Sequence, residues 1–295
     1  ADAEVSYRAS AGEIDVGPFT FRSAPADDAP LRMLVFADAH TNADTVPLVA
    51  QMGLEAGVDL AVGVGDSVSQ PEEAQFDSLL DSLRALGHRV SWWPVLGNHE
   101  ARGQAYFDAV ALPGGNPKEP HEAWYAARVG TVWFAALELQ DITMTAGFGT
   151  DMPEVVWLRE QLASDAARTA TWRLFFIHQP PWCAGWGHCD APIYHGEPTL
   201  RTFLVPLAAE HDVAAIFSGH MHGYEHGVVN GVHLVISGGA GGALDMTCDT
   251  PDDFPSPWTA AYEHHALIVD AACDALTIEA RRFDGSAIDT VTIPK

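Results

Sequence analysis

Short apolar runs alternate with segments of helical periodicity along most of the chain, and this alternation constrains the fold more than any other feature of the sequence. The runs 31–37, 59–64 and 89–96 have the length and composition of buried strands. Amphipathic segments at 43–56 and 71–86 lie between them. Strands that feed helices in this order predict an α/β protein.

The second half of the chain is richer in strand signals. The runs 123–129 and 131–139 predict a hairpin that turns at Gly130, and 172–177 predicts another strand. Helices are expected at 153–167 and 199–210, with a long irregular loop before the second. A series of β-type runs predicts a second sheet packed on the first: 213–217, 224–229, 232–236, 263–269, 276–282 and 288–293.

The charge of the chain limits its partners. Acidic residues outnumber basic ones by 40 to 15, the formal charge is −25, and lysine occurs only at Lys118 and Lys295. Because a nucleic-acid backbone attracts cationic surfaces and repels anionic ones, no nucleic-acid groove is expected. The longest apolar runs fall well short of the roughly 20 residues that cross a bilayer, so no membrane span is expected.

Four cysteines allow three pairings. Cys183 and Cys189 flank a short glycine-containing loop and favour a local disulfide formed in an oxidising compartment. A structural zinc site is the weaker alternative, because the spacing matches no zinc motif. The chain begins at Ala1 in a polar stretch without methionine, as a secreted or periplasmic protein does after loss of a signal peptide. A chain trimmed for expression would begin the same way.

Side chains that bind metals follow five of the expected strands. If the carboxyl ends of these strands meet at one sheet edge, where open α/β sheets bind ligands, the side chains gather there. Each of the following segments comes directly after an apolar run: Asp38-Ala39-His40, Gly65-Asp66, Gly97-Asn98-His99-Glu100, His178-Gln179-Pro180-Pro181 and Gly219-His220-Met221-His222.

These segments offer more donors than one ion can use. Two ions that share a bridging carboxylate would use them all, and paired metals recur in enzymes that hydrolyse phosphate esters. The nitrogen and oxygen donors suit iron, zinc or manganese, and the absence of thiolate argues against copper(I) and iron–sulfur clusters. The candidate metal ligands are Asp38, His40, Asp66, Asn98, His178, His220 and His222.

In order and spacing, the five segments resemble the motif set of the calcineurin-like metallophosphoesterases, and the resemblance covers most of the chain. It implies an α/β fold in the form of a four-layer αββα sandwich, with two mixed β-sheets flanked by helices. Residues 1–30 would then form an N-terminal β extension, and residues 31–295 the metallophosphoesterase catalytic domain.

The resemblance also implies a role for each motif residue. Asp66 would bridge the two metals, and a hydroxide held between them would attack phosphorus. His99 would lie on the leaving-group side, where it stabilises or protonates the departing oxygen. One metal would be held by Asp38, His40 and His222, and the other by Asn98, His178 and His220.

The segment 219–225 is similar to the corresponding segment of purple acid phosphatases, but two departures argue against a purple enzyme. Ser69 stands where those enzymes have a tyrosine ligand, and the first motif is Asp-x-His instead of Asp-x-Gly. Ser/Thr protein phosphatases have an aspartate at the position of Ser69, which supports their catalytic histidine. Without that carboxylate, His99 is expected to be a weaker acid catalyst, so substrates with good leaving groups should be affected least.

Residues near the motifs are candidates for substrate contact. Trp182, Trp186 and His188 lie in the loop after His178 and could form a wall for an aryl group, a nucleobase or a lipid headgroup, or could fill the loop itself. Arg102 is a candidate phosphate ligand, or an ordinary surface arginine. His226 stands where the similar purple-enzyme segment usually has arginine.

The sequence thus predicts a dinuclear metal-dependent hydrolase of small phosphorylated substrates, either phosphodiesters or activated phosphomonoesters. Few cations lie near the motifs to hold a monoester dianion, which favours diesters. The alternatives are a phosphomonoesterase, a nuclease, and a non-catalytic protein that binds a phosphorylated ligand. The charge argues against the nuclease, and the oligomeric state is left open.

Overall fold

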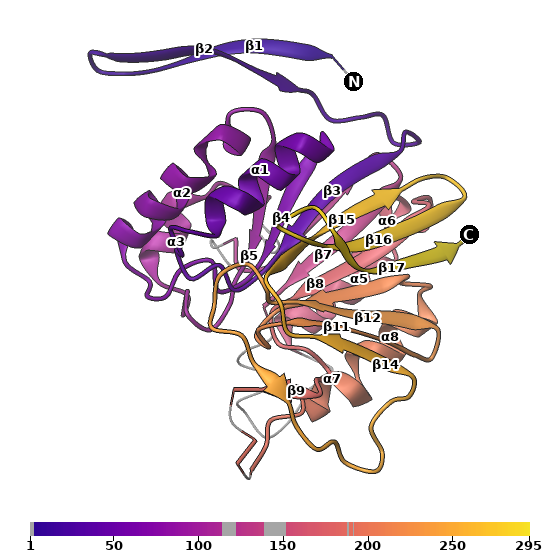
Figure 1. Cartoon of the computed structure of the whole chain (residues 1–295). Helices are drawn as coiled ribbons and strands as arrows, with labels where there is room; N and C mark the ends of the chain where they lie inside the picture. Colours follow the sequence, from indigo (N-terminus) through magenta and orange to yellow (C-terminus); the bar gives the residue numbers. More distant parts are fainter. Residues whose placement is uncertain (1–2, 114–121, 139–151, 188, 191) are drawn as a thin grey trace.

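Two large β-sheets form the centre of the structure, a computed structural model that describes residues 3–113, 122–138, 152–187, 189–190 and 192–295. Both sheets are mixed, and helices flank them (Figure 1). This confirms the expected α/β architecture of two mixed sheets flanked by helices. None of the described helices is long and apolar enough to cross a membrane.

The first sheet has six strands in the order β17-β16-β15-β3-β4-β5. β3, β4 and β5 run parallel, and the three strands from the C-terminal end of the chain add to β3 in antiparallel fashion. The strand bounds are Leu31–Phe36 (β3), Leu60–Val64 (β4), Ser91–Val95 (β5), His265–Ala271 (β15), Ala275–Arg282 (β16) and Ala287–Pro294 (β17).

The second sheet has seven strands in the order β14-β11-β12-β10-β8-β7-β6. We expected the strands after residue 213 to form the second sheet. The second sheet also includes the earlier strands β6, β7 and β8, and β15, β16 and β17 belong to the first sheet instead. The strand bounds are Tyr125–Val129 (β6), Val132–Leu137 (β7), Trp172–Ile177 (β8), Ala215–Ser218 (β10), Tyr224–Val229 (β11), Val232–Ser237 (β12) and Trp258–Ala261 (β14).

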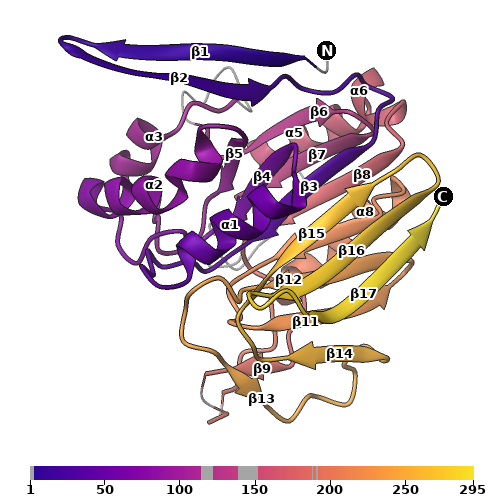
Figure 2. The same cartoon turned by 45° about the horizontal axis from the view of Figure 1, so that its top comes forward.

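Helices cover the outer faces of both sheets (Figures 1 and 2). α1, α2 and α3 lie on the side of the six-stranded sheet, and the later helices lie on the side of the seven-stranded sheet. Their bounds are Val46–Ala56 (α1), Glu73–Gly87 (α2), Gln104–Ala109 (α3), Pro153–Leu162 (α5), Asp165–Arg168 (α6), Pro198–Thr202 (α7) and Leu204–Glu210 (α8).

The alternation of side chains along each strand divides the core into layers. Met33 and Val35 of β3 point into a cluster built from strands of both sheets, which includes Phe134 and Phe176. Leu34 of β3 belongs instead to the cluster that contains the apolar faces of the helices. Burial on both faces explains why these strands are continuous apolar runs in the sequence.

A two-stranded hairpin, β1 (Glu4–Ala11) and β2 (Ile14–Arg22), precedes the sheets and lies along one end of the molecule (Figure 2). The Tyr7 hydroxyl donates to the carbonyl of His88, and the Phe19 ring stacks on the His88 imidazole with centroids 3.8 Å apart. The hairpin is thus anchored at the end of α2. The division into two domains at residue 30 stays a prediction.

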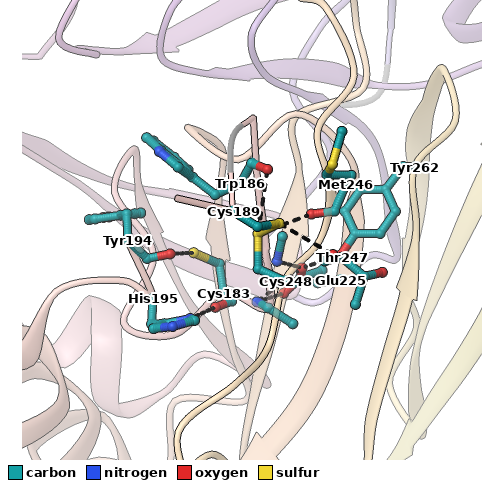
Figure 3. Close-up of a disulfide and its surroundings, with 12 residues drawn as sticks. Cys183, Trp186, Cys189, Tyr194, His195, Glu225, Met246, Thr247, Cys248 and Tyr262 are labelled. Carbon is teal, nitrogen blue, oxygen red and sulfur yellow. Dashed lines mark hydrogen bonds between the residues drawn. A yellow bond between two sulfur atoms is a disulfide. The ribbon is translucent and has the colours of Figure 1, made fainter. Parts of the chain in front are cut away.

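The disulfide pairing predicted from the sequence is wrong. Cys189 is bonded to Cys248, 59 residues further along the chain, whereas Cys183 is a buried free thiol (Figure 3). Two short strands, β9 (Gly185–Trp186) and β13 (Met246–Thr247), pair and bring the two distant segments together. Cys183 packs instead against Met221 and Ile236, in a small apolar cluster of its own.

Candidate metal centre

The five motif segments meet at one edge of the two sheets, because each follows the carboxyl end of a strand. β3, β4 and β5 of the six-stranded sheet lead to Asp38, Asp66 and Asn98. β8 and β10 of the seven-stranded sheet lead to His178 and to the pair His220 and His222. The candidate ligands therefore come from both sheets.

Three overlapping groups of donor atoms lie within this edge, each with its atoms within 4.8 Å of one another. Asp66 belongs to two of the groups, which is the position expected of a bridging carboxylate, and His40 also belongs to two. The groups are Asp38 with His40 and His222, His40 with Asp66 and His99, and Asp66 with His178 and His220.

Asn98, the remaining candidate ligand, lies next to His178. Its side-chain oxygen lies 3.1 Å from His178 Nε2, and Asp66 Oδ2 lies 3.1 Å from the same nitrogen. His178 Nδ1 faces the Val64 carbonyl at 2.9 Å and donates its hydrogen there, which leaves Nε2 as an acceptor. Three acceptors then face one another, an arrangement that requires a proton or a metal ion between them.

The second half of the centre also brings together groups that need a cation between them. His222 Nδ1 donates to the Ala243 carbonyl at 2.8 Å. Its Nε2 faces His40 Nε2 at 3.3 Å and Asp38 Oδ1 at 3.5 Å. Asp38 is fully buried, and the only cation near its Oδ1 in the described part of the chain is a protonated His222, whose charge burial opposes but whose pKa this carboxylate raises to about 9. A buried carboxylate is costly unless a cation compensates its charge, and a metal ion would compete with the proton for this place, so these residues fit a metal site.

The electrostatics of the metal-free side chains agree with this interpretation. Burial opposes the charged form of His178, but the Asp66 carboxylate outweighs burial and raises the pKa of His178 to about 10. Burial and the neighbouring His178 lower the pKa of His220 to about 3. A proton on His178 therefore occupies the place of a cation, and a metal ion would compete with that proton for Nε2.

Several ligand residues have left-handed backbone conformations, with φ of 59° at Asp38, 51° at Asp66 and 70° at His220. Such conformations cost about 1–3 kcal/mol each in residues other than glycine and cluster at functional sites. Two neighbouring glycines make room for the carboxylates. A Cβ at Gly97 would lie 2.3 Å from Asp66 Oδ1, and one at Gly219 would lie 2.5 Å from Asp38 Oδ2.

Glu100 organises the loops around Asp66, a role that the sequence analysis did not assign to it. Its buried carboxylate accepts hydrogen bonds from the backbone nitrogens of Asp66 (2.9 Å), Ser67 (2.8 Å) and Gly97 (2.7 Å). Burial raises the pKa of Glu100 to about 7. The third motif segment contains Glu100, but its role was not predictable from the sequence, because its partners are backbone groups and include those of the segment after β4.

His99 lies beside the donor groups, with its Nε2 3.8 Å from Asp66 Oδ2 and its ring 4.8 Å from that of His40. Its Nδ1 lies 2.8 Å from the carbonyl oxygen of Ser69 and donates a hydrogen there. Ser69 therefore orients the imidazole through its backbone, and Nε2 is left to face the site.

The candidate substrate contacts are dispersed. Trp186 lies at the centre, with its ring 5.2 Å from that of His220, and Tyr194 contacts the same histidine at 5.2 Å, although the sequence analysis did not single it out. Trp182 packs instead under the guanidinium of Arg201. His188 lies outside the described residues.

Two further candidates have partners of their own. Arg102 donates to the buried carboxylate of Glu138, which compensates its charge. His226 lies in β11 with its Nε2 3.0 Å from His233 Nδ1, and neither histidine is in a donor group of the centre.

Comparison with known proteins identifies this architecture. The purple acid phosphatase PPD1 from yellow lupin (Lupinus luteus) has a TM-score of 0.78 at 18% identity over 99% of this chain, which spans 59% of the lupin protein. GAP50, the anchor in the inner membrane complex of Plasmodium, has a TM-score of 0.68 at 17% identity, covering 90% of this chain and 89% of that one. A dimetal phosphatase from Danio rerio has a TM-score of 0.60 at 15% identity, covering 90% and 98%.

These likenesses show a shared fold, and the sequence itself shows the family. The profile described as calcineurin-like phosphoesterase matches residues 31–224, which is more than half of the chain and includes all five motif segments. The chain therefore belongs to the calcineurin-like phosphoesterase family.

Proposed function

We propose that the chain is a dinuclear metal-dependent hydrolase of phosphate esters that acts on phosphodiesters or on monoesters with good leaving groups. The observation that carries this proposal is the convergence of carboxylate, imidazole and amide oxygen atoms, all of them metal-ligand types, around Asp66, His178 and Asn98. When bound there, two metal ions would supply an activated water and neutralise charge on the phosphoryl oxygens. Iron, zinc and manganese all suit the donor set.

The residues of the chain divide the work. Asp38, His40 and His222 would hold one metal, with Asn98, His178 and His220 on the other and Asp66 between them. His99 Nε2 is aimed at the same space and is free to exchange a proton with the leaving oxygen, because Nδ1 is held by the Ser69 carbonyl. These roles are those that the family resemblance implies, and the contacts of the side chains in this chain are compatible with them.

The preference for diesters rests on the cations near the centre. A monoester dianion carries one more negative charge than a diester and gains more from an arginine or lysine beside the metals. Arg102, the arginine next to the third motif, is paired with Glu138. The site therefore offers less compensation for a dianion, which favours diesters and activated monoesters over a general phosphomonoesterase.

Turnover of bis(p-nitrophenyl) phosphate and of p-nitrophenyl phosphate tests the proposal, with protein reconstituted with manganese, zinc or iron. We expect diester turnover that Asp66→Asn abolishes. Asp212→Asn is the matched control, because this carboxylate is 88% exposed and should leave turnover unchanged. Exclusive monoester turnover would make the protein a phosphomonoesterase, and no turnover with any of the three metals would overturn the enzymatic proposal.

We also propose that the protein is exported to the periplasm or the extracellular space. The support is the Cys189–Cys248 disulfide, since such bonds persist mainly in oxidising compartments. Thiol titration of denatured protein isolated without reductant should find two reactive thiols, those of Cys183 and Cys273. Four thiols would contradict the proposal.

A further inference from the structure

Two segments distant in the sequence form a cap beside the metal centre, which we define as residues 183–187 and 243–248. The cap is joined by the pairing of β9 with β13 and closed by the disulfide from Cys189 to Cys248 (Figure 3). It lies at the end of the molecule opposite the β1–β2 hairpin (Figures 1 and 2). Its position next to the ligands makes it a candidate for substrate selection.

The cap is attached directly to the metal ligands. The Ala243 carbonyl accepts from His222 Nδ1, and Asp245 Oδ2 accepts from the His222 backbone nitrogen at 2.7 Å. On the other strand, the Trp186 ring lies 5.2 Å from that of His220. Both histidines of the last motif therefore touch the cap, so whatever binds at the metals lies next to it.

A buried carboxylate holds the base of the cap in place. Glu225 in β11 is fully buried and accepts hydrogen bonds from the backbone nitrogens of Ala184 (2.8 Å) and Gly185 (2.8 Å). The Trp258 indole and the Tyr262 hydroxyl donate to the same carboxylate, at 2.7 and 3.2 Å. The backbone that carries Trp186 is thus fixed on both sides, by this network and by the disulfide.

The face that the cap presents is apolar. Met246 lies directly opposite Trp186 in the pairing of β9 with β13, so their side chains share one face. Met246 is 54% exposed, and Leu244 in the same segment is 37% exposed. The Tyr194 ring packs against Trp186 with centroids 4.6 Å apart, lies 5.2 Å from the ring of His220, and so supports the indole.

We propose that Trp186, with Met246 beside it, forms an apolar subsite that binds a flat aromatic substituent of the phosphoester while the phosphate lies at the metals. The proposal rests on the function proposed above. An indole that is held in place and next to the phosphate position stacks on a ring at little cost in conformational entropy. A small alkyl substituent has too little surface to gain much from this face, so the subsite separates aromatic from small alkyl esters.

The test compares two ligands that cannot be hydrolysed. Calorimetric titration of manganese-loaded protein gives the dissociation constants of phenylphosphonate and methylphosphonate, which share the metal-binding group and differ only in the substituent. We expect phenylphosphonate to bind about tenfold more tightly to the wild type. Trp186→Ala should lower this preference to less than about threefold and leave the affinity for methylphosphonate within about twofold.

Control variants separate the subsite from general damage. Trp182→Ala removes a tryptophan of the same loop that packs on Arg201, and it should leave the phenyl preference unchanged. Trp186→Phe keeps an aromatic face and should retain most of the preference. The phosphonate analogue of thymidine 5′-monophosphate, which cannot be hydrolysed, distinguishes two sources of the ring in the same titration, because a nucleobase that fits should bind like the phenyl compound and lose affinity equally in Trp186→Ala.

The failures are distinguishable. Equal binding of the two phosphonates to the wild type, or an equal loss of affinity for both in Trp186→Ala, would overturn the proposed subsite. If bis(p-nitrophenyl) phosphate were still hydrolysed, the proposed function would stand. Binding of neither phosphonate, together with no turnover, would overturn both.

Discussion

The contact between His99 and the Ser69 carbonyl is the most informative departure from the family pattern at the scale of single residues. A carboxylate in that place would orient the ring and also stabilise the imidazolium through its charge. A neutral carbonyl oxygen orients the ring equally well but stabilises the charge less. His99 is therefore expected to be a weaker acid catalyst than a histidine supported by a carboxylate, and the nature of the leaving group should decide how much the reaction depends on it.

His99→Ala should thus reduce turnover unevenly. For esters of alkyl alcohols, whose leaving oxygen needs a proton, we expect a loss of about 10² to 10⁴. For p-nitrophenyl esters the loss should be about tenfold or less, because the phenolate leaves without a proton. A plot of rate against leaving-group pKa should be steeper for the variant. Parallel plots for the wild type and the variant would show that His99 is not the acid.

A buried histidine outside the metal centre makes stability depend on pH. His265 is fully buried, its Nδ1 donates to the Glu263 carbonyl, and its Nε2 accepts from Ser237. Burial lowers the pKa of His265 to about 4. Because the unfolded chain takes up this proton near pH 6.5, stability is complete above that pH and falls as the pH drops toward 4.

We expect His265 to contribute a loss of about 2 kcal/mol in the free energy of unfolding between pH 7 and pH 5. Urea unfolding of chelator-treated protein at the two pH values measures it, and His265→Asn, which cannot titrate, should show a loss smaller by that amount. Identical pH dependence in the two proteins would show that His265 is protonated in the folded state.

Residue types and spacing were enough to predict which side chains converge at the sheet edge, because each motif consists of metal-binding residue types placed directly after an apolar strand. They were insufficient for groups that act through backbone contacts. Glu100 binds nitrogens of another segment, and Ser69 acts through its carbonyl, which every residue has. Tyr194 reaches His220 from the long loop after His178, a contact that its place in the sequence does not reveal.

At the scale of elements, loss of the disulfide should change ligand binding at the cap and should not change metal binding at the centre. The ligands follow the ends of core strands. The contacts that hold them, those of Glu100 and those of Ala243 and Asp245 on His222, do not include the disulfide. Cys248→Ser should therefore lower the preference for phenylphosphonate several-fold and leave the metal content unchanged.

Cys273→Ser, which alters an exposed free thiol, is the control for that variant and should leave both quantities unchanged. Loss of metal from Cys248→Ser would contradict the separation, because it would show that the cap holds the ligands in place.

The turn after β5 depends on the absence of a side chain. Because a Cβ at Gly97 would lie 2.3 Å from Asp66 Oδ1 and 2.9 Å from Glu100 Oε2, Gly97→Ala must displace the Asp66 carboxylate, which we propose to bridge the metals. We expect at least a tenfold loss of metal affinity, comparable to the loss of a supporting contact. Metal titration measures it, and Gly87→Ala in α2, where a Cβ meets no atom within 4 Å, should leave the affinity unchanged. Equal affinities in both variants would contradict this reading.

Elements were predictable wherever burial on both faces or a helical period marked them, as in β3, β4 and α2. The pairing of β9 with β13 was not, because each strand has two residues and their register depends on segments about 60 residues apart. The disulfide prediction failed for that reason, since proximity in sequence favoured Cys183. The return of β15 to the first sheet likewise follows from the packing of whole strands.

At the scale of the whole molecule, the centre joins the two sheets. Asp38, Asp66 and Asn98 follow strands of one sheet. The candidate ligands His178, His220 and His222 follow strands of the other. Without a cation, buried carboxylate and acceptor atoms face one another across this junction. Metal binding should therefore stabilise the packing of the sheets in addition to supplying the chemistry.

Metal removal should lower the melting temperature of the whole domain in one transition. A metal present at about 100 times its dissociation constant adds about 2.7 kcal/mol to the folded state. For a chain of this size that corresponds to a shift of about 4 °C. Calorimetry with and without a chelator measures the shift, and Asp212→Asn should retain it while Asp66→Asn should lose most of it. An equal shift in Asp66→Asn would place the stabilising metal elsewhere, because only a centre that uses the bridging carboxylate ties the stability of both sheets to that residue.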